Sequence, residues 1–251
     1  MFKKYKKIII IMLFVLISIS SYAFRLDNII FNQRIDGPDG GYRESYIVND
    51  SLEKVRYKIS VLPGNEKDGS KYVQVYPRVI TVEPKSKGVV KIYAKAPSSI
   101  EKGEYHFKLQ FKPIVIPTLA KAKDGKITGT ANIQISPIID MKGYAGEIDF
   151  KNVIKFEDIK VENNLNGKGI IVTGKLSNDS FAGIDFGAEA YGFNDFFYGA
   201  AYIGNVEKET KNKFIKLSFS QIKKPSDLKK IIFYRTPSNK REIIKEITIN
   251  Q

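Results

Sequence analysis

The sequence has 251 residues, of which 43% are hydrophobic and 27% are charged, a composition typical of a folded chain. It has no cysteine and one histidine, which excludes disulfide scaffolds, Cys/His zinc sites, thiol nucleophiles and mechanisms that need two histidines. The net charge of +14 is typical of proteins that bind nucleic acid, but four of the lysines lie at the extreme N-terminus.

The N-terminal segment has the pattern of a secretory signal. Lysines at positions 3, 4, 6 and 7 precede an unbroken apolar run over residues 8–17, and Ser21 and Ala23 place small residues where a signal peptidase reads them. We therefore expect residues 1–23 to be a signal peptide and the mature chain, with a net charge of +10, to begin at Phe24. The alternative is an uncleaved anchor, because neighbouring apolar residues extend the run toward the roughly 20 residues of a membrane span.

Residues 24–145 alternate apolar and polar side chains with period two, as a strand with one buried face requires. Turn residues such as Pro63-Gly64-Asn65 separate the short runs. The expected strands contain Tyr46/Val48, Val55 to Val61, Tyr72/Val73/Val75, Val79/Thr81, Val89 to Tyr93 and Tyr105 to Phe111.

Residues 146–251 form a second strand-rich block. The expected strands contain Ile170/Val172, Lys175/Leu176, Ile184 to Ala188, Phe214 to Phe219, Ile231 to Tyr234 and Ile243 to Ile249. Each block has one strand that ends in Asn-Asp-Ser, at 49–51 and at 178–180, where a hairpin turn is expected. The sequence thus predicts an all-β fold of two immunoglobulin-like antiparallel β-sandwich domains, 24–145 and 146–251, after the signal segment.

The order of elements from Ile29 to Lys142 resembles the N-terminal domain of the PapD-like periplasmic pilus-assembly chaperones. The most specific match is the segment 75–84, in which six residues separate Pro77 from Pro84, followed by the apolar-basic-apolar strand at 89–92. The other matching pieces are Ile29-Ile30-Phe31, Tyr46-Ile47-Val48-Asn49 and Gly103 to Leu109.

The resemblance implies a mechanism of strand addition. Members of this family complete a pilus subunit that lacks its last strand, by pairing it with their own seventh strand and the long loop before that strand. The corresponding loop here runs from Ile114 to Gly129 and the strand from Thr130 to Met141. The candidate donated face comprises Ile133, Ile135, Ile138, Ile139 and Met141, for which ordinary core packing is the alternative.

The resemblance also implies a carboxylate anchor, since the family holds the C-terminus of its subunit with two basic residues in the cleft between domains. Lys142 falls at the position of the family's cleft lysine, but Asn28 stands where its first-strand arginine is expected. Arg25 and Arg34 are close enough in sequence to substitute for it only if the strand register differs from that of the family. An asparagine cannot bind a carboxylate in the two-pronged manner of a guanidinium, so the chain departs from the family pattern here.

The segment from Tyr191 to Tyr202 is the densest aromatic stretch of the sequence. It is expected to form either an exposed loop that binds protein or carbohydrate, or a buried hairpin. The lone His106 is expected at the surface, and no motif indicates a metal, a cofactor or an enzyme.

Two functions follow from these observations. The first is an exported periplasmic chaperone-like protein that binds pilin-like or other surface subunits by β-strand addition, with an outer-membrane usher as a possible second partner. The alternative is a structural or adhesive component of a cell-surface assembly, built from two immunoglobulin-like domains. Neither involves nucleic acid, and each involves the membrane only through the signal segment during export.

Overall fold

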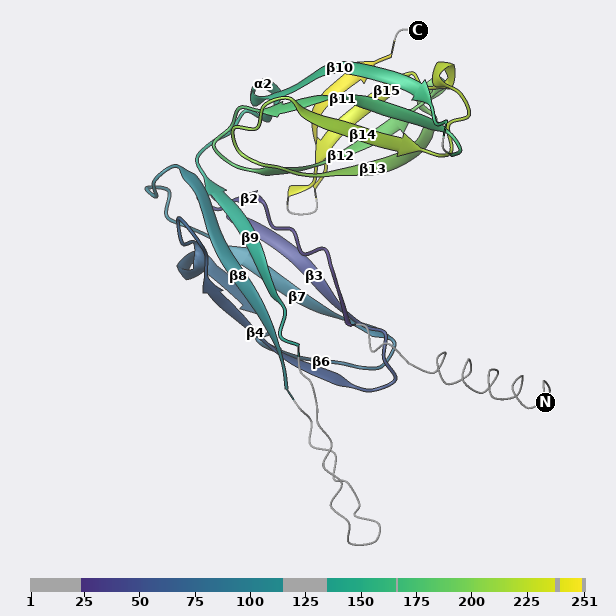
Figure 1. Cartoon of the computed structure of the whole chain (residues 1–251). Helices are drawn as coiled ribbons and strands as arrows, with labels where there is room; N and C mark the ends of the chain where they lie inside the picture. Colours follow the sequence, from purple (N-terminus) through teal and green to yellow (C-terminus); the bar gives the residue numbers. More distant parts are fainter. Residues whose placement is uncertain (1–23, 115–134, 166, 238–239, 250–251) are drawn as a thin grey trace, which may run out of the picture.

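The computed structural model describes residues 24–114, 135–165, 167–237 and 240–249. Over these residues the regular secondary structure is almost entirely β-strand, and the chain forms two sandwiches joined end to end (Figure 1). The expected signal segment, residues 1–23, lies outside the described residues. Within the described part, no helix has the length and apolar character needed to cross a membrane.

The first sandwich pairs a four-stranded sheet, ordered β1-β3-β7-β5, with a five-stranded sheet, ordered β2-β9-β8-β4-β6. Its strands are β1 (Phe24–Asp27), β2 (Gln33–Arg34), β3 (Gly41–Asn49), β4 (Val55–Pro63), β5 (Val73–Tyr76), β6 (Val79–Val82), β7 (Ser86–Ala94), β8 (Gly103–Pro113) and β9 (Ile138–Ala145), with a 3-10 turn η1 (Ser70–Tyr72) before β5. These orders correspond to the A-B-E-D and G-F-C sheets of an immunoglobulin domain.

The second sandwich pairs the sheet β10-β11-β14 with the sheet β13-β12-β15-β16. Its elements are α2 (Phe150–Val153), β10 (Ile154–Asn163), β11 (Ile170–Asn178), β12 (Ile184–Tyr191), η2 (Phe193–Asp195), β13 (Phe197–Val206), β14 (Lys213–Phe219), η3 (Pro225–Asp227), β15 (Lys230–Arg235) and β16 (Glu242–Thr248). The predicted fold class is therefore confirmed.

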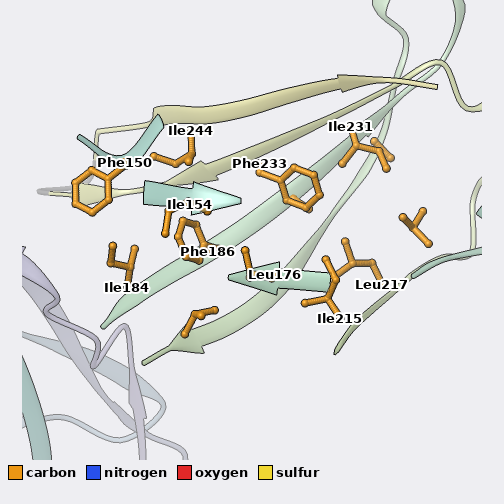
Figure 2. Packing of buried hydrophobic residues seen from close by; sticks show 14 of the residues in the cluster. Phe150, Ile154, Leu176, Ile184, Phe186, Ile215, Leu217, Ile231, Phe233 and Ile244 are labelled. Atoms are coloured by element: carbon orange, nitrogen blue, oxygen red, sulfur yellow. The ribbon is translucent and has the colours of Figure 1, made fainter. Parts of the chain in front are cut away.

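The core of each sandwich follows from the alternation. On β8, Phe107, Leu109 and Phe111 are at most 1% exposed, while the polar residues between them are only partly buried. Figure 2 shows the equivalent core of the second domain, which contains Phe186 of β12 and Phe233 of the neighbouring strand β15. Burial of this apolar surface is the main force that stabilises both sandwiches.

The two Asn-Asp-Ser turns are not the expected hairpins, because each joins strands of different sheets, but the two turns have the same hydrogen-bond network. Asn49 donates its side-chain amide to the carbonyls of Glu53, Val82 and Glu83, and its Oδ1 accepts from the amide and the hydroxyl of Ser51. The second turn repeats these bonds one by one. Asn178 donates to the carbonyls of Ala182, Val206 and Glu207 and accepts from both groups of Ser180.

The connection between the sandwiches is held by a buried carboxylate. Asp36 accepts a 2.8 Å bond from Arg34 Nε and a 3.0 Å bond from the amide of Gly146, where the chain leaves β9. Arg34 also pairs with Glu147 at 2.9 Å. Burial raises the pKa of Asp36, but these hydrogen bonds outweigh it, so the pKa of Asp36 lies below its ordinary value.

Candidate functional site

Strand β9 has one open edge. It pairs with β8 along its whole length, whereas β2 pairs with it only at Gly143 and Tyr144. On the side away from β8, no strand in the described part of the chain pairs with residues 138–141. This is the last strand of the first sandwich, and it lies at the rim of its sheet.

The direction of the backbone groups on this edge follows from one hydrogen bond. The carbonyl of Tyr144 accepts from the amide of Ile35 on the outer side of β9, while the carbonyl of Pro137 accepts from Phe111 of β8. Since successive residues of a strand direct their N–H and C=O groups to opposite sides, Ile138 and Asp140 present theirs to the open edge. An added strand would find two pairs of donors and acceptors there.

The side chains expected on a donated face fall into two groups in the structure, one exposed to solvent and one packed in the core. Ile135 is 77% exposed and Ile138 is 49% exposed, and both are accessible to a partner. Met141 is 2% exposed and belongs to the core, with Ile139 packed partly against that core. Met141 is therefore wrong as a partner contact, because its position in the strand points it inward between the two sheets. Ile133 lies outside the described residues.

The described strand also begins later than expected. The sequence favours a strand from Thr130 to Met141, whereas β9 runs from Ile138 to Ala145. Residues 115–134, which contain most of the expected long loop, lie outside the described part of the chain.

Lys142 lies at the boundary between the two domains, as expected for a cleft residue. Its Nζ atom is 2.6 Å from Glu207 Oε2 of the second domain and 3.5 Å from Glu104 Oε1 of β8. The Glu104 side chain is only 2% exposed and accepts a 2.5 Å bond from the amide of Gly183. His106 Nε2 lies 3.1 Å from the same carboxylate, so this histidine belongs to the domain boundary and not to the open surface expected for it.

The charge on Lys142 is stabilised by these carboxylates. Burial lowers the pKa of Lys142, but the hydrogen bond to Glu207 and the charge of Glu104 outweigh burial, and its pKa lies above the ordinary value. Lys142 is therefore a charged ammonium group whose nearest carboxylates come from the protein itself.

A cleft of about 260 Å³ opens beside Lys142. Apolar side chains of the first domain form part of its wall, and polar groups of both domains form the rest. The lining residues are Ile29, Ile30, Phe31, Asn32, Ile139, Asp140, Met141, Lys142, Asp185, Asn205 and Glu207.

The structure does not bring Arg25 to this cleft. Arg25 pairs with Val48 across β1 and β3 and forms a 2.8 Å ion pair with Asp27. Val48 lies five residues along β3 from Arg43, which reaches the second domain, and five residues of strand span about 17 Å. Arg25 is thus wrong as a partner of Lys142 in a carboxylate anchor.

Arg43 is a basic residue at the domain boundary that the sequence analysis did not identify. Its Nη1 atom donates a 3.1 Å bond to the carbonyl of Thr236, and burial lowers its pKa, against the opposing effect of Asp185 and Tyr202. Asp185 also accepts a hydrogen bond from Asn32, which ties the two domains together beside Arg43. The polar face of the strand at 41–49 was the available signal, but nothing in the sequence distinguishes Arg43 from other basic residues on strand faces.

Comparison with known proteins gives fold neighbours only. No protein-family model matches the sequence, and no curated protein matches it. Among solved structures, the YadV chaperone is 11% identical, with 90% of this chain and 99% of that chain covered and a TM-score of 0.40.

Two further solved structures show the same level of likeness. The CupB2 chaperone of Pseudomonas aeruginosa is 12% identical over 90% of this chain and 100% of that chain, with a TM-score of 0.36. A chain from the complex of Salmonella enterica SafA pilin with the SafB chaperone is 10% identical over 92% and 99%, with a TM-score of 0.40. Each of these likenesses has an identity of 12% or less and a TM-score of 0.40 or less, and the site residues described above come from this chain alone.

Proposed function

We propose that the protein is an exported, periplasmic chaperone-like protein that binds pilin-like or other surface subunits by β-strand addition at the open edge of β9. The observation that carries this proposal is the combination of unpaired backbone groups at Ile138 and Asp140 with the exposed side chains of Ile135 and Ile138. Exposed strand edges are usually covered or charged, and one that keeps apolar side chains is suited to pairing with another chain.

The occupied last-strand position favours this function over the alternative of a subunit or adhesin in a surface assembly. A subunit that is completed by donation lacks its own last strand. Here β9 supplies that strand and pairs with β8 from Gln110 to Gly103. The first sandwich is therefore complete and has an edge to offer.

The proposal also assigns a role to Lys142, which would bind a carboxylate of the bound subunit. Because Glu207 already holds the ammonium group at 2.6 Å, a client carboxylate binds by exchange with Glu207. The Glu207 side chain is 59% exposed and can swing into solvent, whereas the buried Glu104 remains in place. An outer-membrane usher is the further partner that such a complex would meet.

The backbone test of strand addition uses Asp140. Substitution of Asp140 by proline removes an N–H group that faces the open edge and leaves the bonds to β8 intact, so the sandwich should still fold. Asp140→Ala is the matched control, because it removes the same side chain and keeps the N–H group. Each variant is expressed with the exported surface subunits of its native cell, and retained subunits are measured after purification from the periplasm.

Strand addition predicts that wild type and Asp140→Ala retain a subunit and that Asp140→Pro, with an unchanged circular dichroism melt, does not. Equal retention by the alanine and proline variants would show that the edge of β9 does not carry binding. Retention of no subunit by the wild type would favour the structural or adhesive function instead.

The carboxylate exchange has a separate test. Glu207→Gln should increase affinity for a peptide with the client's free C-terminus about fivefold, the factor that corresponds to loss of one exposed ion pair. The same peptide with an amidated C-terminus should bind wild type and Glu207→Gln alike. An equal effect of the variant on both peptides would show that Lys142 does not bind the client carboxylate, and it would leave the proposal of strand addition unaffected.

A further inference from the structure

The turn between β12 and β13 presents three phenylalanine rings to solvent. Phe193, Phe196 and Phe197 are 65%, 61% and 52% exposed, and we refer to them as the aromatic patch. The turn is ordered by its own backbone, since the amide of Gly192 donates to the carbonyl of Phe196 at 2.8 Å and the amide of Phe196 donates to Phe193 at 3.1 Å. Asn194 at the centre of the turn has φ of 53°, a conformation that asparagine tolerates. The rings are therefore held outward, away from the core.

A lysine-rich loop lies directly beside the aromatic patch. The amide of Lys229 donates to the carbonyl of Tyr191 at 2.8 Å, and Lys229 Nζ lies 4.2 Å from the centroid of the Phe193 ring. Lys230 Nζ is 2.7 Å from Asp195. Residues 191–198 and 220–230 together contain four lysines and two acids, so this end of the second domain is apolar and cationic at once.

We infer that the aromatic patch and its lysines bind the surface of a membrane that contains anionic phospholipid. Aromatic rings enter the interface between lipid headgroups and acyl chains, and lysines near the surface are attracted by anionic headgroups. The net charge of the mature chain, +10, adds a long-range attraction toward such a surface. Phenylalanine has no group that can hydrogen-bond a sugar hydroxyl, and the adjacent Asp195 is engaged by Lys230, which argues against a carbohydrate.

The position of the patch keeps this activity separate from strand addition. Strand β12 starts at Ile184, next to the residues that contact the first domain, and ends at Tyr191, about 24 Å farther along the strand. The patch lies beyond that far end. The second domain can thus rest on a membrane while the edge of β9 in the first domain stays accessible.

The test is co-sedimentation of the full mature chain with vesicles. Vesicles of phosphatidylethanolamine with phosphatidylglycerol should bind the wild type, and vesicles of phosphatidylcholine alone should bind it weakly. Replacement of Phe193 and Phe196 together by serine should lower the partition coefficient by at least tenfold, because each ring contributes about a factor of ten when buried. Raising the salt concentration should weaken binding of the wild type through its lysines.

The matched control is Phe214→Ser. Phe214 on β14 is 66% exposed, as exposed as Phe193, but it pairs with Lys175 on another part of the domain. This variant should bind as the wild type does, and all variants should show the melting behaviour of folded protein. The inference is overturned if the wild type does not bind vesicles that contain phosphatidylglycerol, or if replacement of Phe193 and Phe196 does not weaken vesicle binding. It is also overturned if the wild type binds only polysaccharide or a protein partner through these rings.

Discussion

Asn178 should be one of the most sensitive single positions for the stability of the second sandwich. It is fully buried, its amide donates to the carbonyls of Ala182, Val206 and Glu207 at 2.9–3.1 Å, and its Oδ1 accepts from Ser180. Asn178→Ala leaves these buried groups without their partner. Asn178 makes five such bonds, because its Oδ1 accepts from both the amide and the hydroxyl of Ser180, and at about 1 kcal/mol each they give an expected loss of about 5 kcal/mol, a large part of the stability of a domain.

The assay is hydrogen exchange with mass spectrometry in increasing urea, which reports each sandwich separately. Asn178→Ala should lower the free energy of exchange in β11, β12 and β14 and leave the first sandwich unchanged, while Asn49→Ala should do the reverse. The exposed Asn163 on β10 provides the control, and its replacement by alanine should cost less than about 0.5 kcal/mol. A loss below about 1 kcal/mol for Asn178→Ala would refute the idea that the shared turn network holds each sandwich together.

Two more predictions concern the connection between the domains. Asp36→Asn should destabilise the protein by about 1–2 kcal/mol at neutral pH, because the bond from Arg34 is weakened. Folding lowers the pKa of Asp36, so its contribution to stability is present above the unfolded-state pKa and is lost as the pH falls through the folded-state pKa. Urea titrations of variant and wild type should therefore converge as the pH falls below the ordinary range of an aspartate, and a constant difference would contradict the ion pair. Arg235→Leu should lower the free energy of unfolding, measured by urea titration, by about 3 kcal/mol, because the Arg235 guanidinium lies 3.8 Å from the ring centroid of Phe150 and donates a 3.1 Å bond to the Tyr144 hydroxyl. An unchanged midpoint would show that these contacts do not contribute to stability.

Much of the fold could be predicted from period-two patterns, and the exceptions have physical causes. The strand β10 was missed because its alternation is interrupted at Asp158, which has φ of 53° at a register shift between β10 and β11. The strand β13 was missed because it contains many small residues, such as Gly199 and Ala200, and only Val206 among its ten residues is fully buried. A bulge and a weakly buried strand both remove the apolar periodicity on which the prediction depends.

The candidate site was predicted only in part, since a sequence pattern gives which residues share a face but not what that face contacts. Ile139 and Met141 share the core face, while Ile138 belongs to the other face. Lys142 was singled out by the family resemblance, whereas its contact with Glu207 joins positions 65 residues apart and left no local signal. Arg25 failed because β1 places it at the opposite end of β3 from the domain boundary.

The two-residue strand β2 gives the open edge of β9 a closed end. It runs parallel to β9, opposite Gly143 and Tyr144, and so occupies the place that an incoming strand would need in order to travel farther toward the second domain. Strand pairing alone tolerates sliding, and a slip by one residue exchanges the two faces of the added strand. A strand added along β9 would end where it meets Gln33 of β2. The short strand β2 would thereby fix the register of the added strand, and with it the choice of which client side chains face the sandwich and which face solvent.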